Sequence, residues 1–208
     1  MNSDCLLRIT KSNLRHNFLP YALLSAALIL LAPVIFGLCE LDRQLSAQPL
    51  EMYLSLTGMF VLTPVFMPEQ NTEIRDTVRS KRMDCTEVYL IRSLYSLLFM
   101  ALIIGGFTLY MHHMNCDVDK WHFISGYGAA LFLGSVGFFV SGVSGNTVAG
   151  FMASSVVYIA NFGMGKKFGD LCIFTISYHT NGRIWVLYAV SAVLIITALI
   201  ADRYKKSI

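Results

Sequence analysis

Charged side chains are scarce in this sequence. Only 14% of the 208 residues are Asp, Glu, Lys or Arg, whereas a soluble domain carries about 25%. The few charges gather in short segments between long apolar runs, and the longest polar stretch, residues 68–87, is too short to bury a core of its own. We therefore predict no separate soluble domain, and a single all-α polytopic membrane domain over residues 1–208.

Several signatures of chemistry are also missing. The five cysteines form no CxxC pair and their number is odd, which indicates neither a zinc site nor a disulfide framework. The stretch GMGKKFGD that begins at Gly163 has no Ser or Thr after its first lysine and follows an apolar run instead of a strand, so it is not a phosphate loop. No nucleophile–base pair or HExxH motif is present. We expect no enzyme activity and no cofactor.

The sequence also argues against a metal site and against a nucleic-acid partner. A polar loop carries adjacent histidines, whose side chains point in different directions on most backbones, so we predict no metal site at His112, His113, Cys116, Asp117 and Asp119. The net charge of +3 is mild and suggests no nucleic-acid partner.

Six apolar runs are long enough to cross a bilayer, since about 20 helical residues span about 30 Å. Pro33 lies near the end of the first, where a kink is tolerated in a membrane, and Pro64 should kink the second. A seventh apolar stretch, residues 171–177, is too short to cross, and a five-span alternative with one late re-entrant segment stays open. The expected spans are residues 18–38, 49–67, 88–110, 122–143, 147–164 and 184–201.

The distribution of Lys and Arg predicts the orientation. With six spans both termini lie on one side, together with residues 68–87, and that side holds eleven of the sixteen Lys and Arg residues. Because basic residues favour the cytoplasmic side, both termini and this segment should be cytoplasmic.

Ionisable side chains deep within the spans are nearly absent from the sequence. Glu51 is expected at the depth of the membrane interface, and Arg92 near a span end, where its side chain can reach back to the surface. Without a buried Asp, Glu, Lys or Arg, a proton pump, a self-powered transporter or an intramembrane protease is disfavoured.

The segment 68–87 has the pattern of a short amphipathic helix. Asn71 is a good N-cap, acidic residues come first and basic residues last, in the order that complements a helix dipole. Ile74 and Val78 share one face. Two interpretations remain open: a helix that docks into a groove of a soluble partner, and a solvated loop that only obeys the positive-inside rule.

Small residues recur every four positions in the fourth span, at Gly126, Ala130 and Gly134. This spacing lets helix backbones approach closely in lipid. It indicates either packing inside one chain or a seam between two copies.

The residues PEQNTEIRDTVRSKRMDCTEVYLIRSLYSLLF, positions 68–99, are similar to a stretch of the permease subunits of type-2 ATP-binding-cassette (ABC) exporters. In that family an acidic residue, a short coupling helix and basic residues precede a long third span. Residues 1–17 are polar and basic with interspersed apolar residues, and two interpretations stay open: a short amphipathic helix at the inner surface and a frayed tail. The number of spans, an amphipathic start and the inside termini also resemble the family. The mixed segment after the fifth span resembles its extracellular re-entrant hairpin.

This resemblance implies a plasma-membrane exporter that moves a peptide, an antibiotic or a lipid-like molecule. Its partners would be cytoplasmic ATPase subunits, which bind the ATP, a second identical or related permease chain, and membrane lipid. Glu69 would lie at a hinge before the coupling helix. The residues implied in ATPase coupling are Glu69, Glu73, Ile74, Arg75, Asp76, Val78 and Arg79.

Two alternatives from other classes stay open. The first is a substrate-capture subunit of a vitamin importer, which has a similar length and number of spans but docks through small-residue patches. The second is a membrane scaffold or immunity protein without a transport role. A co-purifying ATPase separates the exporter from the scaffold.

Overall fold

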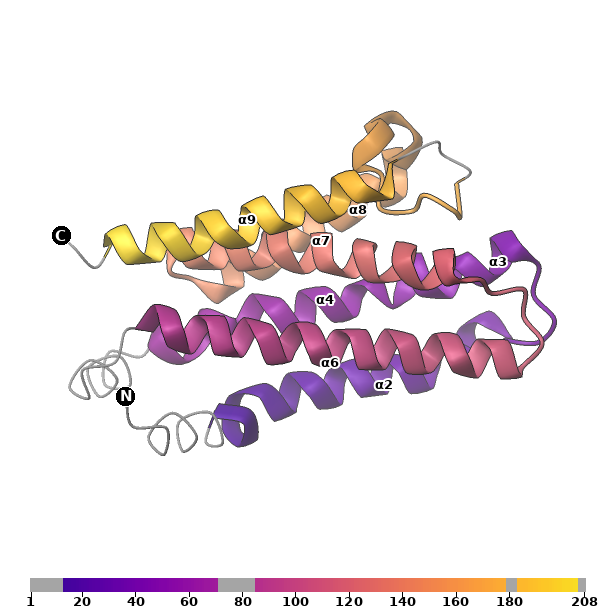
Figure 1. Cartoon of the computed structure of the whole chain (residues 1–208), viewed down its shortest axis with the longest axis horizontal. Helices are drawn as coiled ribbons and strands as arrows, with labels where there is room; N and C mark the ends of the chain where they lie inside the picture. The colour runs from indigo at the N-terminus through magenta and orange to yellow at the C-terminus, as the bar shows by residue number, and fades with distance from the viewer. Residues whose placement is uncertain (1–12, 71–84, 179–182, 206–208) are drawn as a thin grey trace.

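The structure is a computed structural model that describes residues 13–70, 85–178 and 183–205. Within these ranges all regular structure is helical and no strand is present, so the predicted all-α class is confirmed for this part of the chain (Figure 1). Six helical segments are long and apolar enough to cross a membrane, as the sequence predicted. They are α2 (Leu19–Phe36), Arg43–Pro68, α6 (Cys85–His113), α7 (Lys120–Ser144), α8 (Thr147–Met164) and α9 (Ile184–Lys205).

The second span is a composite of four short helices. The chain runs through α3 (Arg43–Gln48), the π-helix η2 (Pro49–Tyr53), α4 (Ser55–Leu62) and the 3-10 helix η3 (Thr63–Gln70). The change from α to 3-10 geometry comes just before Pro64, where the sequence predicted a kink, because proline cannot donate the next helical hydrogen bond. α2, in contrast, continues through Pro33 and ends at Gly37, which has a positive φ of 56°.

The expected start of the second span at residue 49, after a polar loop, was wrong, because Arg43–Gln48 is already helical. Ser46 and Ala47 of this helix are fully buried, and the Ser46 amide donates to the carbonyl of Asp42. The buried face of this helix is made of these two small residues, so the polarity of the segment did not mark a loop.

α7 is the central helix, and packs most extensively against α9, α4 and α8. It crosses α4 so closely that a Cβ added to Gly58 would lie 1.8 Å from the carbonyl oxygen of Ala130. Gly134 faces the Gly58 backbone at the same crossing, and Gly126 faces Leu50. The small-residue row therefore packs inside one chain, and its interpretation as a seam between two copies was wrong.

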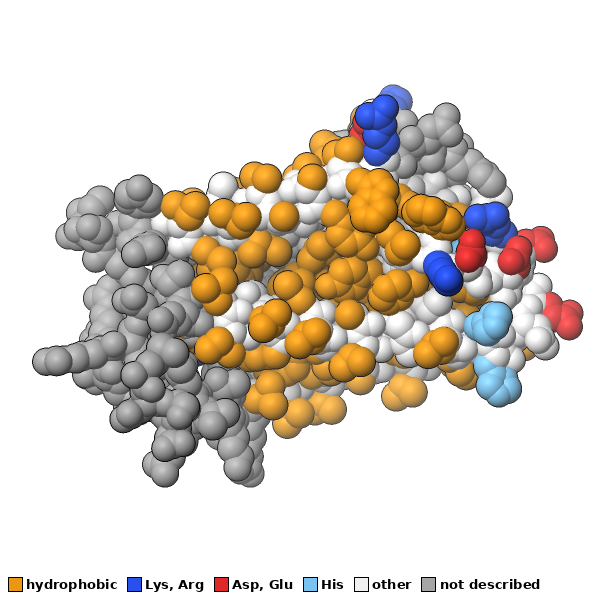
Figure 2. Space-filling model, viewed as in Figure 1, with side chains coloured by type: hydrophobic (Ala, Val, Ile, Leu, Met, Phe, Trp, Pro, Cys, Tyr) orange, Lys and Arg blue, Asp and Glu red, His pale blue; other side chains and the backbone are white. Residues whose placement is uncertain are grey.

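The bundle has two distinct ends. The short π-helix η1 (Leu14–Phe18) precedes α2 at one end, where η3 ends, α6 begins and α9 ends; we call this the terminal end (Figure 1). At the opposite end, the loop end, lie the connections 37–42 and 114–119 and the 3-10 helix η4 (Gly165–Leu171). Figure 2 shows apolar side chains over the middle of the visible face, with described charged and histidine side chains gathered towards the loop end.

Candidate functional site

A fully buried carboxylate lies near the loop end of the bundle. Glu51, in η2, has no exposed surface and accepts five hydrogen bonds. Its Oε1 accepts from the Ser125 and Thr175 hydroxyls, the latter at 3.1 Å, and from the Ile176 amide at 2.9 Å. Its Oε2 accepts from the amide and the hydroxyl of Ser177, at 2.9 and 2.7 Å. Three parts of the chain distant in sequence therefore meet at one side chain.

The π-helix carries Glu51 and has its own polar partners. In η2 the Leu54 amide bonds the Pro49 carbonyl at 2.9 Å, five residues back instead of four. Such a wide turn disturbs the regular pairing of helical carbonyls and is frequent at functional sites. The carbonyl of Met52 accepts a hydrogen bond from the Tyr158 hydroxyl of α8 at 2.7 Å. The second and fifth spans are thus joined beside the carboxylate.

Residues 172–178, which we call the returning segment, follow η4 and fold back into the bundle. Cys172, Ile173 and Phe174 are fully buried, and pack in one cluster with side chains of α7 and α9. Burial of a side chain such as Phe174 contributes about 1.5–3 kcal/mol. The sequence predicted that this apolar stretch is too short to cross the membrane. In the structure it lies between helices of the bundle, in agreement with that prediction.

Polar contacts hold the returning segment at further points. The Asn161 side chain of α8 accepts from the Ile173 amide at 3.1 Å. The Gln44 side chain of α3 donates to the Ser177 carbonyl at 3.0 Å. Together with Glu51, these groups satisfy backbone atoms that would otherwise be buried without partners, at a cost of about 1–3 kcal/mol each.

The sequence expectation that ionisable residues avoid the interior was wrong. Glu51 is completely buried and Arg92, in α6, is 4% exposed. The exclusion of proton-coupled carriers drawn from that expectation loses its premise. However, all five donors to Glu51 are neutral amides and hydroxyls that occupy both carboxylate oxygens. This arrangement suits an anchor that holds backbone in place.

No local signal marks Glu51 in the sequence. Its hydrogen-bond partners lie 74 to 126 residues further along the chain. Glu51 also follows Pro49 at the start of an apolar run, where a charged residue commonly faces the membrane surface. Only the fold shows that its side chain turns inwards.

The residues implied in ATPase coupling are largely outside the described residues. Glu69 belongs to η3, but its side chain is not described. Beside it, the Gln70 side chain donates to the Thr147 hydroxyl at the start of α8, at 2.6 Å. The remaining implied residues, Glu73, Ile74, Arg75, Asp76, Val78 and Arg79, lie outside the described ranges.

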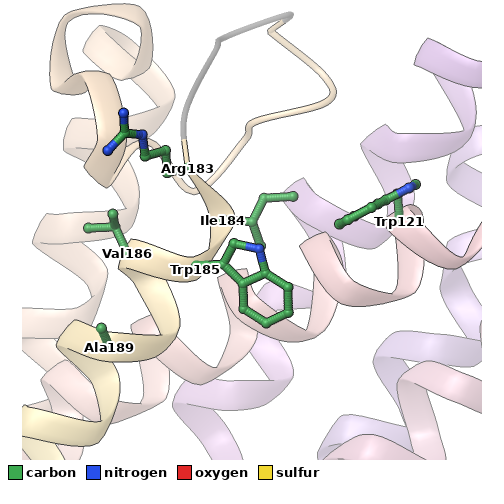
Figure 3. Close-up of a pocket in the computed structure, with 6 residues that line it drawn as sticks. All are labelled: Trp121, Arg183, Ile184, Trp185, Val186 and Ala189. Atoms are coloured by element: carbon green, nitrogen blue, oxygen red, sulfur yellow. The ribbon is translucent and has the colours of Figure 1, made fainter.

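An open groove of about 420 Å³ lies on the outer surface at the loop end (Figure 3). Trp185 and Ile184 project from α9 towards Trp121 of α7, whereas Arg183 and Val186 point to the other side. Both tryptophans are exposed and occupy the second position of their helices. Tryptophans gather at the boundary between lipid and water, so this pair indicates the depth of that boundary.

Comparisons with protein-family models, with curated proteins and with solved structures give no significant match. The function of this chain must therefore be inferred from its own residues and geometry.

Proposed function

We propose that this chain is the transmembrane subunit of an ATP-driven ABC exporter, which moves a peptide, antibiotic or lipid-like substrate out of the cell. The observation that carries this proposal is the returning segment, residues 172–178, buried at the loop end of a bundle of six helices. Its place after the fifth span corresponds to that of the re-entrant hairpin expected from the resemblance. The basic segment 71–84 joins η3 to α6 at the opposite end.

In this proposal the terminal end faces the cytoplasm and the loop end faces the outside of the plasma membrane. The excess of Lys and Arg near the termini and in residues 71–84 supports this orientation. The helix from Glu73 to Arg79 is the coupling helix, and Glu69 lies at its hinge. ATP is bound by separate ATPase subunits, and a second permease chain completes the transporter within the surrounding lipid.

ATP binding moves the spans only if the ATPase subunits dock differently on this chain with and without ATP. A ligand shifts a conformational equilibrium only by its differential affinity for the two states. The ATPase pair must therefore present different surfaces to residues 71–84 with and without ATP. The displacement of that segment then moves the second and third spans, which flank it directly.

Affinity purification of the tagged chain from its native membrane in mild detergent, followed by mass spectrometry, tests the proposal. We expect a soluble ATPase in stoichiometric amount, and a second permease in the same eluate if the transporter is a heterodimer. Ile74→Asp combined with Val78→Asp should abolish ATPase capture, because two charges replace the apolar face. The matched control is Thr72→Asp combined with Ser80→Asp, which adds the same charge away from that face and should keep capture.

Absence of an ATPase from the wild-type eluate, also after crosslinking through residues 68–87, would refute the exporter assignment. It would then favour the scaffold or the substrate-capture alternative.

A further inference from the structure

The 3-10 helix η3, which leads into residues 71–84, has a carbonyl group that lacks its regular 3-10 donor. In a 3-10 helix each amide bonds the carbonyl three residues before it. η3 has Pro68 at the position that would serve Val65, and proline has no N–H. The guanidinium of Arg92 supplies the donor, with Nη1 at 3.1 Å from the Val65 oxygen.

This contact joins the two helices on either side of residues 71–84. Val65 belongs to η3, which ends at Gln70, and Arg92 belongs to α6, which begins at Cys85. Arg92 is nearly fully buried, so its guanidinium has exchanged water for protein partners. A planar guanidinium with several donors can hold more than one group in a fixed geometry, which an ammonium cannot do.

An aromatic cluster extends the same junction to the central helix. The Phe66 ring lies 4.6 Å from that of Tyr89 in α6 and 4.6 Å from that of Phe138 in α7, measured between centroids. The Arg92 guanidinium carbon lies 6.0 Å from the centroid of Tyr89. Phe138 is fully buried, so a displacement of Phe66 must displace α7 or open a gap in a close-packed interior.

We propose that Arg92 is a positioning residue for energy coupling. It fixes η3 and the start of α6 as one unit, so that a force on residues 71–84 moves both spans together and reaches α7 through Phe66 and Phe138. This role rests on the proposed function, since a soluble partner must exert the force.

The test measures movement and docking separately, in the complete complex with its co-purified ATPase. Nitroxide labels are placed on exposed positions of α6 and α9 by Leu94→Cys and Ile196→Cys, after Cys5, Cys39 and Cys85 are replaced by Ser. Pulsed electron paramagnetic resonance then gives the distance between the labels without nucleotide and with ATP plus vanadate.

With Arg92 present we expect a nucleotide-dependent change of this distance. Arg92→Met keeps the length of the side chain but removes its donors, and should lose most of the change while the same amount of ATPase co-purifies. Arg92→Lys keeps a charged donor and should restore part of it. Ser96→Ala, one turn further along α6 at another buried polar position, should behave as the wild type.

Three outcomes overturn the proposal: no distance change with Arg92 present, an unreduced change in Arg92→Met, or loss of the change in Ser96→Ala to the same extent. If Arg92→Met fails to fold, Arg92→Lys decides, and an unreduced change there assigns Arg92 to stability alone. Absence of the ATPase from the wild-type complex refutes the proposed function instead, and is recognised before any label is read.

Discussion

Removal of the Glu51 carboxylate should release the returning segment, and the buried thiol of Cys172 reports that release. In Glu51→Ala, two hydroxyls and two amides at positions 175–177 and one hydroxyl of α7 lose their common acceptor. Leaving a buried donor without its acceptor costs about 1–3 kcal/mol. Five donors are affected, and loss of the carboxylate's own desolvation penalty of several kcal/mol offsets part of the sum, so we expect a net cost of about 3–5 kcal/mol. We expect this loss to appear mainly as local opening, since most of the orphaned donors belong to one short segment.

The size of the effect follows from that free energy. A thiol that reacts only in the open state is labelled in proportion to the open population. Because about 1.4 kcal/mol corresponds to a factor of ten, the labelling rate of Cys172 should rise by roughly 10²–10³-fold. The milder Ser177→Ala removes one hydrogen bond to a charged acceptor, worth about 1.5–3 kcal/mol, and should give an intermediate rate.

The assay uses a small maleimide on the purified protein in detergent, with mass spectrometry of each cysteine peptide. The chain carries its own controls, because Cys39 is exposed and Cys116 is buried at the connection between α6 and α7. Cys39 should react rapidly in every variant, and Cys116 should stay protected. Glu40→Gln, which neutralises an exposed carboxylate near the same end, should leave Cys172 protected.

Two results would refute this reasoning. If Cys172 stays protected in folded Glu51→Ala, apolar packing alone holds the returning segment. If Cys116 becomes reactive in parallel with Cys172, the carboxylate stabilises the whole bundle instead of one segment.

Two further predictions concern packing and the second anchor. Gly58→Ala should lower the midpoint of thermal unfolding in detergent, because the new Cβ meets the Ala130 carbonyl and overpacking costs about 1–3 kcal/mol. The control Gly106→Ala, with open space around its Cβ, should leave the midpoint unchanged. Equal midpoints in the two variants would contradict the close crossing. Asn161→Leu removes the acceptor of the Ile173 amide at a cost of about 1–3 kcal/mol. It should raise Cys172 labelling by roughly 10–100-fold, and an unchanged rate would show that this anchor is dispensable.

The apolar runs predicted the spans well because lipid imposes a simple requirement of length and composition. The fifth span, residues 147–164, coincides with α8, and the sixth begins at Ile184 as expected. The error at Arg43–Gln48 has a physical cause. A short polar helix whose buried face consists of Ser46 and Ala47 has no apolar periodicity to reveal it.

The contacts of the candidate site could not be predicted from the sequence, because they join residues far apart in the chain. The spacing of Gly126, Ala130 and Gly134 indicated close helix contact but not the partner, which the fold supplies as Leu50 and Gly58. Likewise, a glutamate in an apolar run does not reveal a distant set of amides and hydroxyls that will bind it.

The distance in sequence between Glu51 and Ser177 has a consequence for how the protein is made. Ser177 follows Glu51 by 126 residues, so at 5–20 residues per second the ribosome needs roughly 6–25 s to supply the last donors. During that interval the third, fourth and fifth spans enter the membrane while the carboxylate of the second still lacks most of its partners. The loop end must therefore stay accessible to water, or to assisting insertion machinery, until the returning segment arrives. Assembly of the bundle is completed there, by a segment too short to cross a membrane.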